Sequence, residues 1–186
     1  MKSKLFILLL TASLLPALQA FATVLPESCG KDEIKFEVKV TNPPEGQPSP
    51  DIAPPAPGKA QIVFIETLNS EGWHLTTPMT RFGVDGEWAG ANKGASHFAV
   101  DVAPGERNVC VNWQSDWSDE GKKVAMDTFT AEAGKIYYYE IKIVRLSSGE
   151  GKKMDFFFEL KQLGGIEGRY RTKASGLSTS KIKKTN

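Results

Sequence analysis

Apolar and polar residues alternate in short runs along most of this chain. Between Asp32 and Val40 every second residue is apolar, and the residues between them are charged. A period of two places successive side chains on opposite faces of a strand, so this pattern predicts a half-buried strand. The run Ile62–Ile65 is apolar on both faces and predicts a central strand at 59–68. Further strands are expected at 80–84, 87–91, 97–102, 106–113, 124–130, 136–146 and 154–163.

Turn residues separate these runs at regular intervals. Asp85-Gly86 predicts a two-residue hairpin turn, because both positions tolerate a positive φ angle. Pro104-Gly105 suits a type II turn, and Ala133-Gly134-Lys135 marks another turn. No segment of eleven or more residues beyond the N-terminus has helical periodicity. About eight short strands joined by such turns predict an all-β fold, an antiparallel β-sandwich.

The first 22 residues are organised like a secretory signal peptide. Lys2 and Lys4 precede an apolar run at 5–18, and Ala20 and Ala22 supply the small residues of a cleavage site. The apolar run is too short to cross a bilayer comfortably. We therefore expect cleavage after Ala22 and an exported mature chain, periplasmic or extracellular, with no transmembrane span.

The mature chain is long enough for one domain. Residues 23–41 hold an N-terminal segment and the first strand. A Pro-rich linker follows at 42–58, since seven of the eleven prolines lie there. Residues 59–168 form the sandwich core and belong to the same domain as 23–41. The last 18 residues, 169–186, carry six basic side chains and no acidic one, which predicts a basic, flexible tail.

Both cysteines, Cys29 and Cys110, lie in the mature chain. In an oxidising compartment two cysteines of one domain are expected to form a disulfide. A redox or nucleophilic thiol has little support, because the chain has no Cys-x-x-Cys and no Lys or His directly beside Cys110. The disulfide would hold the N-terminal strand over or beside the face of the 106–113 strand from which Cys110 points.

From Gly58 onward the chain resembles a bacterial family known only as domain of unknown function 2846. The matching residues are Gly58-Lys59-Ala60, Val84-Asp85-Gly86, Phe98 leading to Pro104-Gly105-Glu106, and Ala133-Gly134-Lys135-Ile136-Tyr137-Tyr138. The resemblance implies an exported or envelope-associated β-sandwich with no assigned activity. It brings no catalytic or binding residues with it.

Residues for enzyme chemistry are sparse. The chain has two histidines, His74 and His97, and Ser96 beside His97 on a strand would point to the opposite face. His97 falls on the polar side of its strand with Asp101 and is expected to face solvent. Zinc is disfavoured because Cys and His are not clustered. The sequence therefore predicts no catalytic residues, no metal and no cofactor.

The tryptophans are the best candidates for recognition. Trp73, Trp88 and Trp117 are possible ligand-facing aromatics, with packing as the alternative role of each ring, whereas Trp113 is expected in the core. The leading interpretation is a non-catalytic module that binds or supports an envelope protein or glycan through its loops. A carbohydrate-binding module is the alternative, and an enzyme of an unrecognised class is third. Nucleic acid is excluded as a partner, because the acidic body of the chain would repel phosphate.

Overall fold

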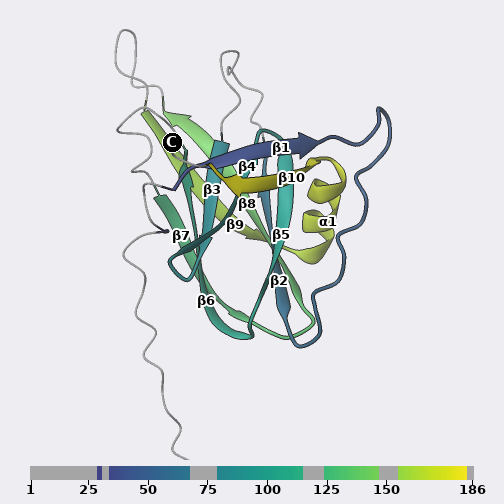
Figure 1. Ribbon diagram of the computed structural model, residues 1–186, viewed down its shortest axis with the longest axis vertical. Coiled ribbons are helices and arrows are strands. Elements are labelled where there is room, and N and C mark those ends of the chain that lie inside the picture. Colours follow the sequence, from purple (N-terminus) through teal and green to yellow (C-terminus); the bar gives the residue numbers. More distant parts are fainter. Residues whose placement is uncertain (1–28, 31–33, 68–78, 115–123, 147–154, 184–186) are drawn as a thin grey trace, which may run out of the picture.

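The fold is a sandwich of two β-sheets with one short helix on its outside (Figure 1). The computed structural model describes residues 29–30, 34–67, 79–114, 124–146 and 155–183. In chain order its elements are β1 (Phe36–Thr41), β2 (Ala60–Glu66), β3 (Met79–Val84), β4 (Glu87–Lys93), β5 (Ser96–Val102), β6 (Gly105–Trp113), β7 (Val124–Ala131), β8 (Ile136–Leu146), β9 (Asp155–Leu163), α1 (Gly165–Lys173) and β10 (Gly176–Ile182). The predicted signal peptide at 1–22 lies outside the described residues.

The strands form a six-stranded sheet in the order β1-β10-β5-β2-β8-β9 and a four-stranded sheet in the order β4-β3-β6-β7. The predicted β-sandwich is confirmed, as is the Asp85-Gly86 hairpin, whose two residues have φ angles of 52° and 84°. The antiparallel pairing that we expected throughout fails at two places. β2 pairs in parallel with β8, and β10 pairs in parallel with β5. Parallel neighbours need long crossover connections, and here the four-stranded sheet and α1 lie within those connections.

β2 lies at the centre of the larger sheet, and one of its faces forms the main core. Phe64 is fully buried between the two sheets. Its ring centroid lies 4.7 Å from that of Phe82, 5.4 Å from that of Phe98 and 6.4 Å from that of Tyr139. These tilted rings join both sheets in one apolar cluster. Trp113, expected in the core, is half-buried and packs against this cluster.

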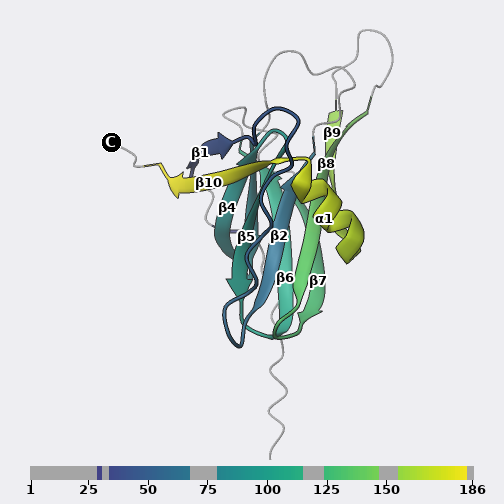
Figure 2. The same ribbon diagram turned by 90° about the vertical axis from the view of Figure 1, so that its right-hand side faces the viewer.

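The other face of β2 is also buried, as its continuous apolar run predicted. Val63 and Ile65 are fully buried in a second cluster with Tyr138. Figure 2 shows α1 on this outer side of the six-stranded sheet. The helix approaches β8 closely at Gly168, where a Cβ atom would overlap the ring of Tyr138. A glycine is therefore required at the point where the helix covers the sheet.

The N-terminal segment crosses the outer face of the four-stranded sheet. The predicted disulfide between Cys29 and Cys110 is present. The carbonyl of Cys29 lies against Gly83, where any side chain would collide with it. Farther along, the Arg81 guanidinium donates to the carbonyl oxygen of Ile34 at 2.6 Å. The disulfide thus holds the segment against β3 and β6 before it enters β1.

Residues 169–182 do not form the flexible tail that the composition predicted. They contain the second half of α1 and all of β10, which pairs with β1 over six residues. The hydroxyl of Ser178 donates to the carbonyl oxygen of Ala91 at 2.9 Å, and the amide of Ala91 donates to the Ser180 hydroxyl at 3.1 Å. Side-chain hydrogen bonds to the edge of β4 therefore replace apolar packing, and the hydrophobic pattern could not reveal them.

Removing the disulfide should destabilise the fold. The two cysteines are 81 residues apart, and closing a loop of that length contributes about 4–5 kcal/mol in the chain-entropy estimate. We expect the double variant Cys29→Ser, Cys110→Ser to lose about 4 kcal/mol of unfolding free energy in denaturant titrations. Thiol titration of the unfolded wild type without reductant provides the control and should detect no free thiol. Equal stability of the two proteins would contradict the assignment.

Candidate functional site

Glu66 and two polar neighbours lie inside the sandwich, at the end of β2. The Thr80 hydroxyl donates to Glu66 Oε2 at 2.6 Å, and Asn92 Nδ2 donates to the carbonyl oxygen of Phe64 at 3.1 Å. All three polar side chains are fully buried. Burial raises the pKa of Glu66 to about 8, although hydrogen bonds from Thr80 and Gly94 favour its charged form. At neutral pH Glu66 is therefore mainly the uncharged acid.

His97 is buried, which corrects the expectation that it faces solvent. Its side chain points to the outer face of the larger sheet, under the segment that follows α1. There its Nδ1 lies 2.8 Å from the hydroxyl of Ser175. Burial lowers the pKa of His97 to about 4, so the ring is neutral at pH 7. Ser96 instead hydrogen-bonds to the backbone of Lys93, so it does not act on His97.

One of the three candidate aromatics is described, and its ring already has partners in the fold. Trp88 is half-buried, and the Arg81 guanidinium lies 4.3 Å from its ring centroid. Gly30 also lies against this ring, so closely that a Cβ atom there would overlap it. Trp73 and Trp117 lie outside the described residues.

An open hollow of about 380 Å³ lies over β6 and β7. Its lining consists of Gly86, Asn108, Val109, Cys110, Met126, Asp127 and Thr128. The carboxylate of Asp127 accepts hydrogen bonds from the Tyr139 hydroxyl at 3.1 Å and from the Thr128 amide at 2.9 Å. Among the described residues of this lining, Asp127 is the one acidic or basic side chain, so these residues do not offer an acid–base pair.

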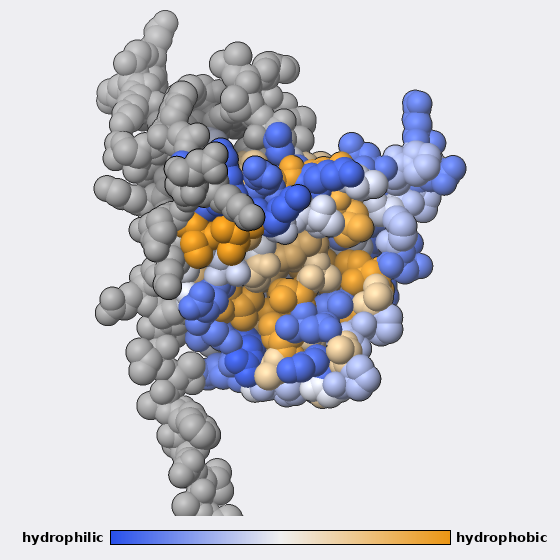
Figure 3. Space-filling view, viewed as in Figure 1, coloured by the Kyte–Doolittle hydropathy of each residue, from blue (hydrophilic) through white to orange (hydrophobic). Residues whose placement is uncertain are grey.

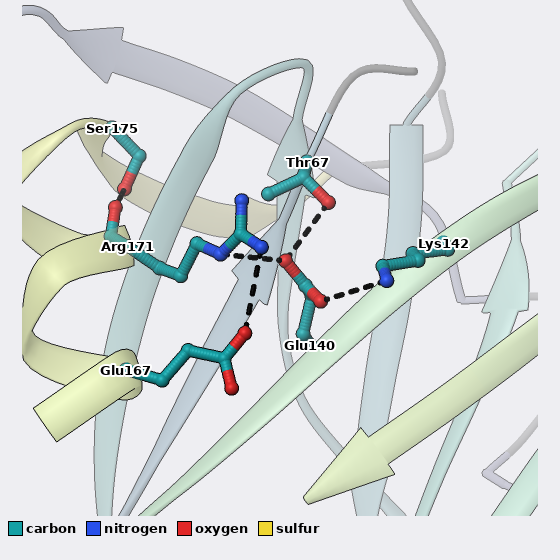
Figure 4. A network of polar contacts seen from close by, with 6 residues as sticks. All are labelled: Thr67, Glu140, Lys142, Glu167, Arg171 and Ser175. Atoms are coloured by element: carbon teal, nitrogen blue, oxygen red, sulfur yellow. Dashed lines mark hydrogen bonds and ion pairs between the residues drawn. The ribbon is translucent and has the colours of Figure 1, made fainter. Parts of the chain in front are cut away.

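A network of charges fastens α1 to the sheet (Figure 4). Glu140, in β8, is fully buried, and its carboxylate lies 3.4 Å from the guanidinium of Arg171 and 3.6 Å from the ammonium of Lys142. The hydroxyl of Thr67 also donates to Glu140 at 3.2 Å. Arg171 reaches back to Glu167 one turn earlier in the helix, at 3.4 Å. The buried Glu140 carboxylate therefore attaches α1 to β8 of the six-stranded sheet.

The C-terminal end of α1 is held from a second direction. The Lys173 ammonium lies 2.8 Å from the carboxylate of Asp51, and the Lys173 carbonyl oxygen accepts from the amide of Ser49 at 3.0 Å. Ser49 is itself buried and donates its hydroxyl to the carbonyl of Ser175. The Pro-rich segment, which has no helix or strand between β1 and β2, thus packs on the helix end.

The opposite side of α1 faces solvent. We call Ile166, Arg169 and Tyr170 the α1 face; their spacing of three and four residues places them side by side on the helix. Ile166 is 81% exposed and Tyr170 is 69% exposed, the largest exposures among the large hydrophobic residues that the structure describes. Figure 3 shows that hydrophobic and hydrophilic residues are interspersed on the side of the molecule that Figure 1 presents. We take the α1 face as the candidate functional site.

Sequence reasoning missed this site because the helix is short. Its nine residues include two glycines besides Ile166 and Tyr170, so no helical periodicity of eleven residues exists. The spacing of Ile166, Arg169, Tyr170 and Lys173, all on one helical face, is the signal that could have indicated it.

No protein-family model, curated protein or solved structure was found to match this chain. Among the described residues, no group of three or more His, Cys, Asp or Glu side chains could hold a metal ion. No helix in the described part of the chain is long and apolar enough to cross a membrane.

Glu66 should make stability fall as the pH rises above neutral. Its pKa is higher in the folded chain than the ordinary 4.5, so its contribution is present below pH 4.5 and is lost as the pH rises towards 8. The pKa of His97 is lower in the folded chain, so its contribution is present above pH 6.5 and is lost as the pH falls towards 4. Between pH 4.5 and 6.5 the effects of Glu66 and His97 on the unfolding free energy have opposite signs. Above pH 6.5 the decrease that Glu66 causes with rising pH remains.

Denaturant titrations at several pH values test this expectation. Between pH 6.5 and 8 the unfolding free energy should fall by about 0.8 kcal/mol per pH unit on average. This slope is below the limiting value of about 1.4 kcal/mol because His97 of the unfolded chain titrates near pH 6.5 and Glu66 of the folded chain titrates near pH 8. Glu66→Gln should remove this slope, whereas Glu37→Gln, at an exposed position of β1, should retain it. A slope that survives Glu66→Gln would contradict the assignment.

The charge network should respond unequally to removal of its two main partners. Arg171→Met leaves the fully buried Glu140 carboxylate with weaker compensation, and we expect a loss of about 2–3 kcal/mol. Glu140→Gln leaves Arg171 partly exposed to water and beside Glu167, so the expected loss is about 1 kcal/mol. Glu167→Gln, at an exposed surface pair, is the control and should change stability by less than about 0.5 kcal/mol. Equal losses for Arg171→Met and Glu140→Gln would contradict the asymmetry.

Proposed function

We propose that this chain is an exported, non-catalytic binding module of the cell envelope. The observation that carries the proposal is the α1 face, where Ile166 and Tyr170 are exposed on a rigidly fastened helix. Large apolar side chains that stay exposed on a well-packed element are typical of an interaction site. Glu66 and His97, whose pKa values burial shifts strongly, are bonded within the fold. This burial supports binding rather than turnover.

Export is the second part of the proposal. The Cys29–Cys110 disulfide is consistent with an oxidising compartment. The signal-peptide pattern at 1–22 places cleavage after Ala22. We also propose membership of the domain-of-unknown-function family 2846, on the turn and strand residues quoted above.

A sugar-binding role has less support. Of the three candidate aromatics, Trp88 has its ring engaged by Arg81 and Gly30. An aromatic ring binds a sugar through a free face, which these contacts reduce. The described residues therefore favour a protein partner over a glycan.

Photocrosslinking in the producing cells tests the binding role. p-Benzoylphenylalanine would replace one exposed residue at a time: Lys39 in β1, Tyr170 in α1, and the neighbouring pair Glu106 and Thr130, which lie opposite each other in β6 and β7. We expect at least one position to give a discrete adduct with an envelope component. The same preparations, analysed by intact mass, should begin at Thr23. The absence of adducts at all four positions, or a mature protein that retains residues 1–22, would contradict the respective part of the proposal.

A further inference from the structure

The α1 face combines two exposed apolar side chains with a cation that forms no ion pair among the described residues. Arg169 is exposed on the same side of the helix as Ile166 and Tyr170. It forms no ion pair with any of the residues that the structure describes. The neighbouring acids are already engaged, since Glu167 pairs with Arg171 and Asp51 pairs with Lys173. An approaching molecule therefore meets an uncompensated guanidinium beside apolar surface.

We infer that the α1 face binds a partner protein whose contact surface carries an apolar pocket next to a carboxylate. This inference rests on the proposed function and names the partner class for it. Tyrosine and arginine are the residue types most enriched among those that dominate protein interfaces. A guanidinium fits a carboxylate through two parallel hydrogen bonds, which fixes the orientation of the partner. The ring of Tyr170 and the side chain of Ile166 would fill the pocket.

The helix is prepared for such contact before any partner arrives. Gly168 packs against Tyr138 below, and the buried Glu140 carboxylate holds Arg171. Lys173 and Asp51 fix the C-terminal end. The backbone of the α1 face therefore loses little conformational freedom on binding, and the entropic cost of association is reduced.

A lipid surface fits the α1 face less well. Two apolar side chains bury less apolar area than a single myristoyl chain, which by itself gives only marginal membrane binding. The α1 face contributes one free cation, whereas binding to anionic lipid depends on clusters of four to eight basic residues. A second copy of this chain is the other molecule that could bind the α1 face. The experiment below distinguishes such dimerisation from binding of a different protein.

The test starts from the producing cells and continues with purified proteins. The variant Tyr170→p-benzoylphenylalanine, in the full chain, should give an adduct with a protein, which is identified by mass spectrometry and then purified. Its affinity for the wild-type chain is measured by calorimetry. Arg169→Glu and Tyr170→Ala should each weaken binding at least tenfold, whereas Arg169→Lys should weaken it less because the charge remains. Raising the salt concentration should weaken the binding of the wild-type chain to the partner, and it should change the binding of Arg169→Glu less.

Further measurements control for the folding of the variants and test for lipid binding and dimerisation. Thr130→Ala, at an exposed position of β7, should bind as the wild type does. Unchanged thermal midpoints would show that the α1 variants are folded, as their exposure predicts. Cosedimentation with vesicles of phosphatidylcholine and phosphatidylglycerol that depends on Arg169, or dimerisation that depends on Tyr170 in analytical ultracentrifugation, would overturn the inference. Wild-type affinity of both Arg169→Glu and Tyr170→Ala would overturn it as well.

The failure of this inference differs from the failure of the proposed function. Adducts at Lys39, Glu106 or Thr130 without any at Tyr170 would show a binding module that uses another face, so the inference alone would fall. The absence of adducts at all four positions would remove the binding role itself.

Discussion

The structure depends on the burial of β2 on both faces. Ile62 and Phe64 require cover from the four-stranded sheet, and Val63 and Ile65 require cover on the other side. A strand placed at the edge of the sheet or facing water would leave this apolar area exposed, at a cost of about 25 cal/mol for each Å². The two-layer sandwich and the position of α1 on its outer side are both consequences of that requirement.

The polar groups inside the fold follow the same requirement. Covering β2 completely also buries Glu66, Glu140 and His97, which lie on β2 or on the strands beside it. Each is accommodated differently. Burial raises the pKa of Glu66 and lowers that of His97, so both side chains are neutral at pH 7, whereas Glu140 lies beside Arg171 and Lys142. A buried ionisable group must either neutralise or find a counter-charge, and this fold uses both solutions.

Much of the fold was predictable because it rests on alternation and turn chemistry. The strands, the Asp85-Gly86 hairpin and the Cys29–Cys110 bridge follow from local patterns and cysteine count. The C-terminal region did not, because Ser178 and Ser180 are held by hydrogen bonds to β4 rather than by apolar packing. The burial of His97 also escaped prediction, since the segment after α1 that covers it was itself unrecognised. The candidate site was missed for the same reason. Which segment packs over the outer face of β2 depends on tertiary contacts, and these are not visible in local sequence patterns.

The pairing of β1 with β10 has a consequence for how the chain matures. Phe36 lies opposite Ile182, so the first and last strands are neighbours although nearly the whole domain separates them in sequence. A polypeptide that is synthesised from its N-terminus exposes β1 long before its partner strand is made. The bridge to Cys110 can form earlier, because β6 emerges before β10. Oxidation can thus retain the leading end of the nascent protein against the half-built sandwich until the final strand closes the sheet.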